Sequence, residues 1–156
     1  MEKELTKAET KEKALRLLEF RSHSEYELRS KLKQKGAKDE DTDEVIEFLT
    51  EYGFLDDLKY ACAKARDLSN LKKYGKIRII AELRHKGIAS DIIDEAVSAL
   101  ETDEAEMLYP MVLKKLGGDF ERKNTEKTIR YFASRGYNIS DIKNVIDEIK
   151  YEFEER

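Results

Sequence analysis

Apolar residues recur along this chain at intervals of three and four positions, the spacing that one face of an α-helix requires. No segment shows the alternation of apolar and polar residues that marks a half-buried strand. We therefore predict an all-α protein of nine helices. The apolar faces of the first three helices are formed by Leu15 and Leu18, by Leu28 and Leu32, and by Val45, Ile46 and Leu49.

Capping residues and helix-terminating residues mark where the predicted helices begin and end. Ser24 and Glu27 have the spacing of a capping box, so a helix should begin there. Gly36 can adopt the left-handed conformation that ends a helix, and Asp56–Asp57 reads as the cap of the fourth. Pro110 should kink the seventh helix or mark a late start. The later helices are expected at about residues 57–69, 74–85, from 90, 102–116, 125–134 and 140–153.

The pattern occurs three times. A basic residue and a glycine end a helix at Lys35–Gly36, Lys86–Gly87 and Arg135–Gly136, with spacings of 51 and 49 residues. Apolar positions on both sides of the glycine align at the same offsets. Repeated units that pack on their neighbours form an extended surface, which favours a binding protein over an enzyme. We predict three tandem three-helix repeats, residues 1–55, 56–101 and 102–156, that form an elongated, curved array.

Composition agrees with a helical protein that has long solvated faces. Charged residues make up 41% of the chain, which contains no Trp and only one Pro. No apolar run approaches the roughly 20 residues of a membrane span, and the N-terminus is too charged for a signal peptide. A single Cys62, expected to be buried and inert, fits a reducing cytoplasm. We therefore expect a cytoplasmic monomer that does not bind membranes.

Residues with enzyme chemistry are scarce. His23 and His85 have neither Cys nor a second His at metal-ligand spacing. Gly117–Gly118 reads as a helix stop and loop, not as a phosphate-binding loop. We predict no catalytic residue, no cofactor and no metal.

Charge is distributed in the same way in each repeat. The second helices carry net charges of +2 over residues 24–36, +5 over residues 72–87 and +3 over residues 121–136. The third helices carry −6 over residues 37–51, −4 over residues 88–101 and −4 over residues 139–155. If the repeats pack with their second helices on a common side, one edge is basic and the other acidic.

Two DNA-binding geometries are compatible with three short helices. In a helix-turn-helix module the last helix enters the major groove, but the acidic third helices would be repelled by phosphates. Contact through the second helices is favoured, against the alternative that they are only solvated faces. Tyr74 either stacks on a base or packs at the helix start. The candidate partner-binding residues of the middle repeat are Lys72, Lys73, Tyr74, Lys76, Arg78, Arg84 and Lys86.

The basic residue before each repeated glycine has two interpretations. A cation near a helix C-terminus is stabilised by the helix dipole, by about 0.3–1 kcal/mol. Alternatively, Lys35, Lys86 and Arg135 make a repeated contact with phosphate or with a protein partner. The structural interpretation is favoured.

Three segments together resemble a known family. Residues 24–36 read SEYELRSKLKQKG, residues 52–61 read YGFLDDLKYA, and residues 74–88 contain YGKIR and ELRHKGI. In this order they resemble the motifs of the RecX family of bacterial recombinase regulators. The matching positions to which the resemblance assigns mostly structural roles are Ser24, Leu28, Leu32, Gly36, Gly53, Asp57, Tyr60, Gly75, Leu83 and Gly87.

The resemblance implies a function as well as a fold. Proteins of this family are tandem arrays of three-helix units that bind the RecA filament on single-stranded DNA and restrain its ATP hydrolysis and strand exchange. It implies no catalytic residue. The pI near 5.4 predicts that binding to bare single-stranded DNA is weak. The alternatives are a module that binds nucleic acid without a recombinase, and a helical scaffold whose acidic edge binds another protein.

Overall fold

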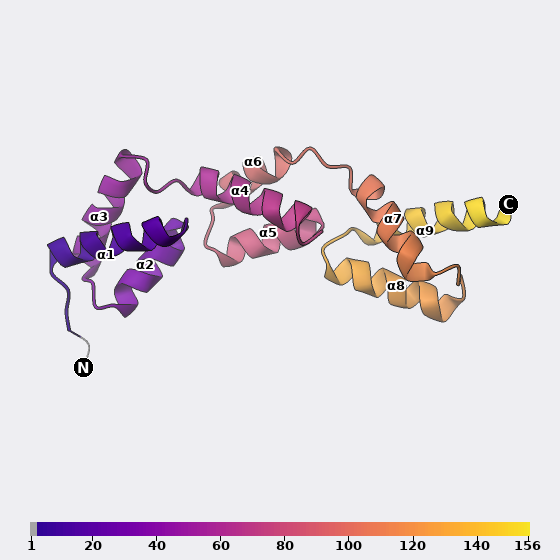
Figure 1. The fold of residues 1–156 in the computed structure, drawn as a ribbon, viewed down its shortest axis with the longest axis horizontal. Coiled ribbons are helices and arrows are strands. Elements are labelled where there is room, and N and C mark those ends of the chain that lie inside the picture. Colours follow the sequence, from indigo (N-terminus) through magenta and orange to yellow (C-terminus); the bar gives the residue numbers. More distant parts are fainter. Residues whose placement is uncertain (1–2) are drawn as a thin grey trace. The chain divides into compact units, whose positions relative to one another are not determined.

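The structure, a computed structural model, describes residues 3–156. These residues form nine α-helices and no β-strand (Figure 1), which confirms the predicted fold class. We call α1–α3, α4–α6 and α7–α9 modules 1, 2 and 3. The helices are α1 (Lys7–Phe20), α2 (Glu25–Gln34), α3 (Asp39–Glu51), α4 (Asp57–Asn70), α5 (Lys76–His85), α6 (Ser90–Ser98), α7 (Glu104–Leu116), α8 (Arg122–Ser134) and α9 (Ile139–Glu154).

Two predicted helix starts need correction. α7 begins at Glu104, after Asp103 accepts hydrogen bonds from the amides of Ala105 and Glu106, and it runs through Pro110. The alternative that Pro110 marks a late start of this helix is therefore wrong. α8 begins at Arg122, three residues before the predicted start at Thr125. The Thr125 hydroxyl donates 3.0 Å to the Arg122 carbonyl within the helix, so it does not cap the helix.

The contacts between residues divide the chain into two compact units. The first holds the described residues up to Lys64 together with Glu82–Ala96, and the second holds Ala65–Ala81 together with Val97–Arg156. Helices α4, α5 and α6 therefore contribute residues to both units. Their buried apolar side chains include Tyr60, Ala61, Ala65, Leu68, Ile79, Leu83 and Ile93.

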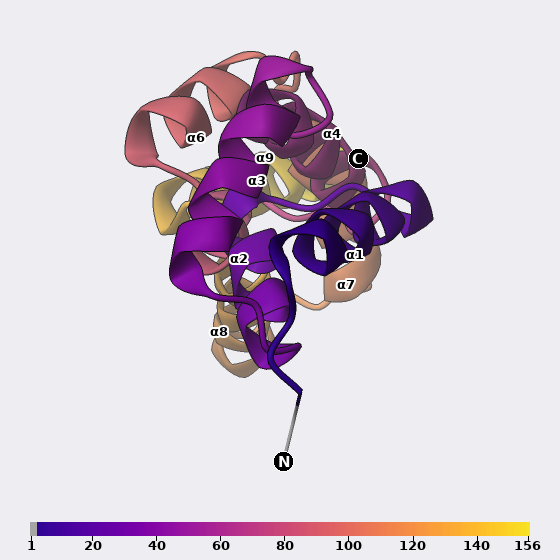
Figure 2. The same ribbon diagram turned by 90° about the vertical axis from the view of Figure 1, so that its left-hand side faces the viewer.

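The core of module 1 lies in the first unit. α1, α2 and α3 lie side by side in both views (Figures 1 and 2). Leu28, Leu32 and Leu49 are fully buried there, as the apolar spacing predicted. The buried face of α1 is not centred on Leu15 and Leu18, as expected from the spacing. Ala14 is fully buried, whereas Leu15 and Leu18 are half-buried.

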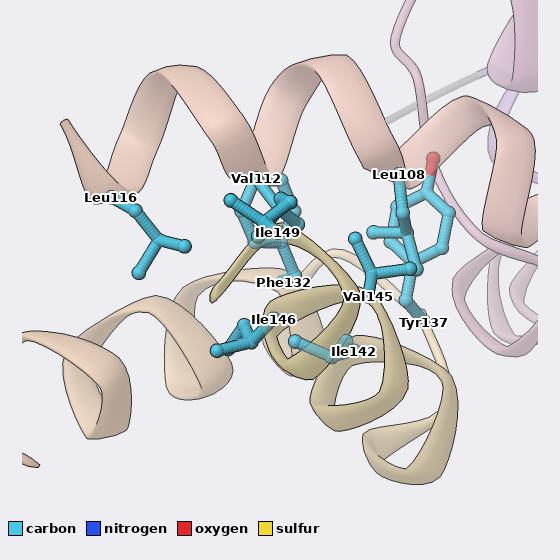
Figure 3. Packing of buried hydrophobic residues seen from close by; sticks show 9 residues of the cluster. All are labelled: Leu108, Val112, Leu116, Phe132, Tyr137, Ile142, Val145, Ile146 and Ile149. Atoms are coloured by element: carbon cyan, nitrogen blue, oxygen red, sulfur yellow. The ribbon is translucent and has the colours of Figure 1, made fainter. Parts of the chain in front are cut away.

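The core of module 3 lies in the second unit. Side chains from α7, α8 and α9 meet between the helices, among them Val112, Phe132 and Ile149 (Figure 3). Tyr137 belongs to this cluster and is 1% exposed. Its hydroxyl oxygen points out of the cluster (Figure 3) and donates a hydrogen bond of 2.8 Å to the Lys73 carbonyl.

The repeated glycine turns also pack on other segments. Gly36, Gly87 and Gly136 all have left-handed backbones, with φ of 98°, 75° and 100°. This confirms the predicted helix ends. Within the first unit, Gly87 lies against the Tyr26 side chain, and a methyl group on Gly87 would overlap the Tyr26 Cβ and Cγ atoms. The turn that ends α5 is therefore also a close contact with the start of α2.

Replacing Gly87 by Ala should destabilise the protein more than replacing Gly53. Both glycines have nearly the same φ, 75° and 76°, so the backbone strain of an added Cβ is equal. No heavy atom lies within 4 Å of a Cβ at Gly53, whereas one at Gly87 collides with Tyr26. We expect G53A to cost about 1 kcal/mol from strain and G87A about 1–3 kcal/mol more from overpacking. Urea unfolding measures both, and equal losses would contradict the contact.

Candidate nucleic-acid and protein interface

The start of α2 is capped from within module 1 and from module 2. Ser24 and Glu27 form the predicted capping box. In addition, the Glu25 amide donates 2.9 Å to the Asp57 carboxylate, and the Ser24 hydroxyl donates 2.7 Å to the Lys86 carbonyl. Asp57 thus caps α2, and Asp56 accepts the amide of Lys59 in the first turn of α4. The bonds from the Glu25 and Lys59 amides satisfy donors that a helix start leaves without intrahelical partners.

The start of α5 in the second unit repeats this arrangement with different residues. The Gly75 amide donates 2.9 Å to the Arg135 carbonyl, and the Ile77 amide donates 3.1 Å to the Gly136 carbonyl. The Lys76 amide donates 2.6 Å to the Glu104 carboxylate. A carboxylate from the following first helix and the carbonyls of the following glycine turn therefore cap α5. A negative charge at this position is also favourable for the helix dipole.

Gly75 is required by this close approach. Gly75 has no left-handed backbone, but a methyl group there would overlap the backbone of Gly136. Gly136 in turn lies against Arg78. The two glycines allow the backbones to approach within hydrogen-bond distance. Both glycines therefore keep this junction closely packed.

Glu27 is a charged hub in the first unit. Its carboxylate lies 3.0 Å from the Arg21 guanidinium and 3.7 Å from the Lys86 ammonium, and its side chain is 12% exposed. Burial alone would raise the Glu27 pKa, but hydrogen bonds from Arg21, the Ser24 amide and the Tyr60 hydroxyl lower it to about 2. Burial and the bond to Glu27 raise the Tyr60 pKa. Lys86, a candidate partner residue, is thus attached to this hub.

A buried histidine lies beside the same hub. His23 is 2% exposed, with Nδ1 2.9 Å from the Arg21 carbonyl and Nε2 3.0 Å from the Lys31 ammonium. Burial lowers its pKa, so the neutral ring can donate at Nδ1 and accept at Nε2. No spacing of residues along the chain predicts this burial, whereas His85 is exposed.

Module 3 holds the loop that precedes α5. The Arg135 guanidinium donates to the Lys72 carbonyl, and Tyr137 donates to the Lys73 carbonyl. Lys73 has a left-handed backbone with φ of 58°, which is uncommon for a residue with a side chain. Burial and the charge of Glu104 raise the Tyr137 pKa to about 12, so its hydroxyl remains a donor. The loop backbone is thus fixed while both lysine side chains are exposed.

Cations and aromatic rings alternate beside this loop. The Arg78 and Arg135 guanidiniums lie 4.5 and 5.1 Å from the Tyr74 ring centre. Arg135 also lies 5.7 Å from the Tyr131 ring, over which the Lys115 ammonium lies at 4.2 Å. Such contacts stabilise exposed sites by about 0.5–1 kcal/mol each. We call Lys72, Lys73, Tyr74, Lys76, Arg78, Lys115, Tyr131 and Arg135 the basic surface of the second unit.

The structure brings most of the predicted partner residues together. Six of them belong to the basic surface. Tyr74 packs against Arg78 and Arg135 just before α5, which is one of the two arrangements considered for it. Lys35, Arg84 and Lys86 belong to the first unit, where Lys35 and Arg84 are exposed. Tyr131 and Lys115 were not predicted. Tyr131 lies one helical turn before Arg135, which is a usable signal, but only tertiary packing brings Lys115 to it.

Other predicted features are also located. Leu28, Leu32, Leu83 and Tyr60 are buried, whereas Cys62 is only half-buried. The described residues contain no group of three or more side chains arranged to hold a metal ion. None of the helices in residues 3–156 is long and apolar enough to cross a membrane.

A helical-repeat protein with a basic surface is the class that this geometry defines. Residues 11–49 match the family model described as RecX, first three-helix domain, and residues 56–97 match RecX, second three-helix domain. The chain belongs to the RecX family.

Relatives and solved structures of this family match the chain over most of its length. The regulatory protein RecX of Vibrio vulnificus is 32% identical over 140 residues, which cover 88% of this chain and 91% of the relative. The regulatory protein RecX of Vibrio cholerae is 37% identical over 138 residues, covering 87% and 90%. The crystal structure of RecX from Lactobacillus salivarius has the same fold, with a TM-score of 0.84 and 23% identity over 93% of this chain and 97% of that one.

Replacing Glu27 by Gln should lower stability and flatten its dependence on acid pH. The folded pKa of Glu27 lies below its ordinary value of 4.5, so its contribution is complete above about pH 4.5 and is lost as the pH falls toward 2. We expect E27Q to lose about 1–3 kcal/mol at pH 7 and to match the wild type near pH 2. Denaturant unfolding over this pH range measures the difference.

Glu47→Gln is the matched control. It removes the same charge from the exposed face of α3, where no hydrogen bond to Glu47 is formed by the described residues. E47Q should therefore lose less free energy of unfolding at pH 7 than E27Q does. A loss for E27Q that does not shrink between pH 7 and pH 2, or that is no larger than the loss for E47Q, would contradict the role assigned to Glu27.

Proposed function

We propose that this protein is a non-enzymatic modulator of the RecA recombinase. It binds the RecA filament on single-stranded DNA and restrains ATP hydrolysis and strand exchange. Membership of the RecX family is the observation that carries this proposal, because two family domains match and the relatives agree over most of their length. The protein acts in the bacterial cytoplasm as a monomer, without cofactor or metal.

The basic surface of the second unit is the proposed contact with the filament. Among the described residues, Lys72, Lys73, Lys76 and Lys115 form no ion pair, so their charges are available to phosphate. The loop backbone is already fixed by Arg135 and Tyr137, so less ordering is needed on binding. The acidic third helices are proposed to face basic parts of the filament protein.

Titration into a RecA ATPase reaction on single-stranded DNA tests this function. We expect strong inhibition at protein concentrations below that of RecA, while binding to bare DNA stays weak. Binding to bare DNA that is strong and falls with salt, with no effect on the ATPase, would instead support a nucleic-acid module without a recombinase. No change in either assay would contradict both.

Reversing three charges of the basic surface should weaken filament binding. We expect the combined variant Lys72→Glu, Lys73→Glu and Lys76→Glu to raise the inhibitory concentration by about tenfold or more, because phosphates repel the new carboxylates. The control Lys11→Glu, Lys13→Glu and Lys59→Glu makes the same change of charge in α1 and α4, outside both the basic surface and the acidic third helices. Circular dichroism checks that both fold. Equal inhibition by both variants would exclude the basic surface as the contact.

A further inference from the structure

Tyr74 and Tyr131 differ in how their rings are covered. Tyr74 is half-buried, and both arginines over it are held elsewhere: Arg78 donates 3.1 Å to the Ser134 carbonyl, and Arg135 donates to the Lys72 carbonyl. These guanidiniums cannot leave the ring without breaking backbone hydrogen bonds. A base therefore has no free access to Tyr74.

Tyr131 has a more accessible ring. It is 41% exposed on α8, and the cation over it at 4.2 Å is the ammonium of Lys115, a long side chain that is itself exposed. No hydrogen bond or ion pair holds Lys115 among the described residues. Stacking a base on an aromatic ring is more favourable than an exposed cation–π contact. A base can thus replace the Lys115 ammonium, which then becomes free to contact the adjoining phosphate.

The chemistry around Tyr131 selects single-stranded nucleic acid. Arg135 lies 5.7 Å from the ring on the same surface, and Lys72 and Lys73 lie in the loop that Arg135 holds. An acidic protein segment would contact these cations but would not use the accessible face of the Tyr131 ring, whereas a single strand uses both. In a duplex the bases are already stacked and give the ring no face.

We propose that Tyr131 is a base-stacking site for single-stranded DNA, with Lys115 and Arg135 on the flanking phosphates. This deepens the proposed function and rests on it for the identity of the strand. The aromatic contact thus belongs to module 3, while the lysines of module 2 contact the backbone of the same strand.

Tryptophan substitution tests the stacking directly, because the protein contains no Trp of its own. The emission of Y131W should be quenched, with saturation, as a short oligothymidylate is added at low salt. Tyr151→Trp is the control, since Tyr151 is 63% exposed on α9 beside acidic residues; its emission should not change. Y131A should bind the oligonucleotide about tenfold more weakly, and Y131F should retain most of the affinity.

The outcomes separate this inference from the proposed function. If the Y131W emission is unchanged while the full chain still inhibits the RecA ATPase, the stacking site is wrong and the function stands. If Y131W is quenched but the ATPase is unaffected, the site is correct and the proposed function is wrong. An oligonucleotide affinity of Y131A equal to that of the wild type would also overturn the stacking site.

Discussion

The described arrangement depends on hydrogen bonds through which one module caps a helix start of the module before it. The first amides of any helix lack intrahelical acceptors and must find others. In α2 and α5 a carboxylate of the next first helix accepts the amide of the first helical residue, through Asp57 and Glu104. The Lys86 carbonyl accepts the Ser24 hydroxyl at the start of α2, and the Arg135 and Gly136 carbonyls accept amides at the start of α5. The turns at Gly87 and Gly136 therefore have two roles: each ends its own helix and supports the start of another.

Much of this fold was predictable because local rules determine it. The apolar spacing located Leu28, Leu32, Val45 and Ile146 in the core, and Gly36, Gly87 and Gly136 adopt the left-handed conformation that helix ends favour. The capping was not predictable. Asp57 is the first residue of α4, and the pair Asp56–Asp57 was expected to cap that helix, but the Asp57 carboxylate accepts the amide of Glu25, 32 positions earlier. Such pairings depend on tertiary packing, which no local pattern encodes.

The candidate site shows the same division. Charge counts identified the second helix of module 2 as the most basic, and Lys72, Lys73 and Tyr74 were named from that count. The sequence could not show that Arg135 and Tyr137, more than 60 positions later, hold the carbonyls of this loop. Nor could the sequence show that the Tyr74 ring is covered whereas the Tyr131 ring is accessible. An acidic chain can thus carry a local basic surface, because folding gathers cations that net charge averages out.

Amide hydrogen exchange in the full chain tests most directly whether module 3 anchors the loop before α5. The Gly75 and Ile77 amides donate to the Arg135 and Gly136 carbonyls, whereas the Lys73 amide of the same loop has no acceptor among the described residues. We predict slow exchange at Gly75 and Ile77, limited by opening of the second unit, and fast exchange at Lys73. Exchange at Gly75 and Ile77 as fast as at Lys73 would contradict the anchoring and, with it, the preformed basic surface.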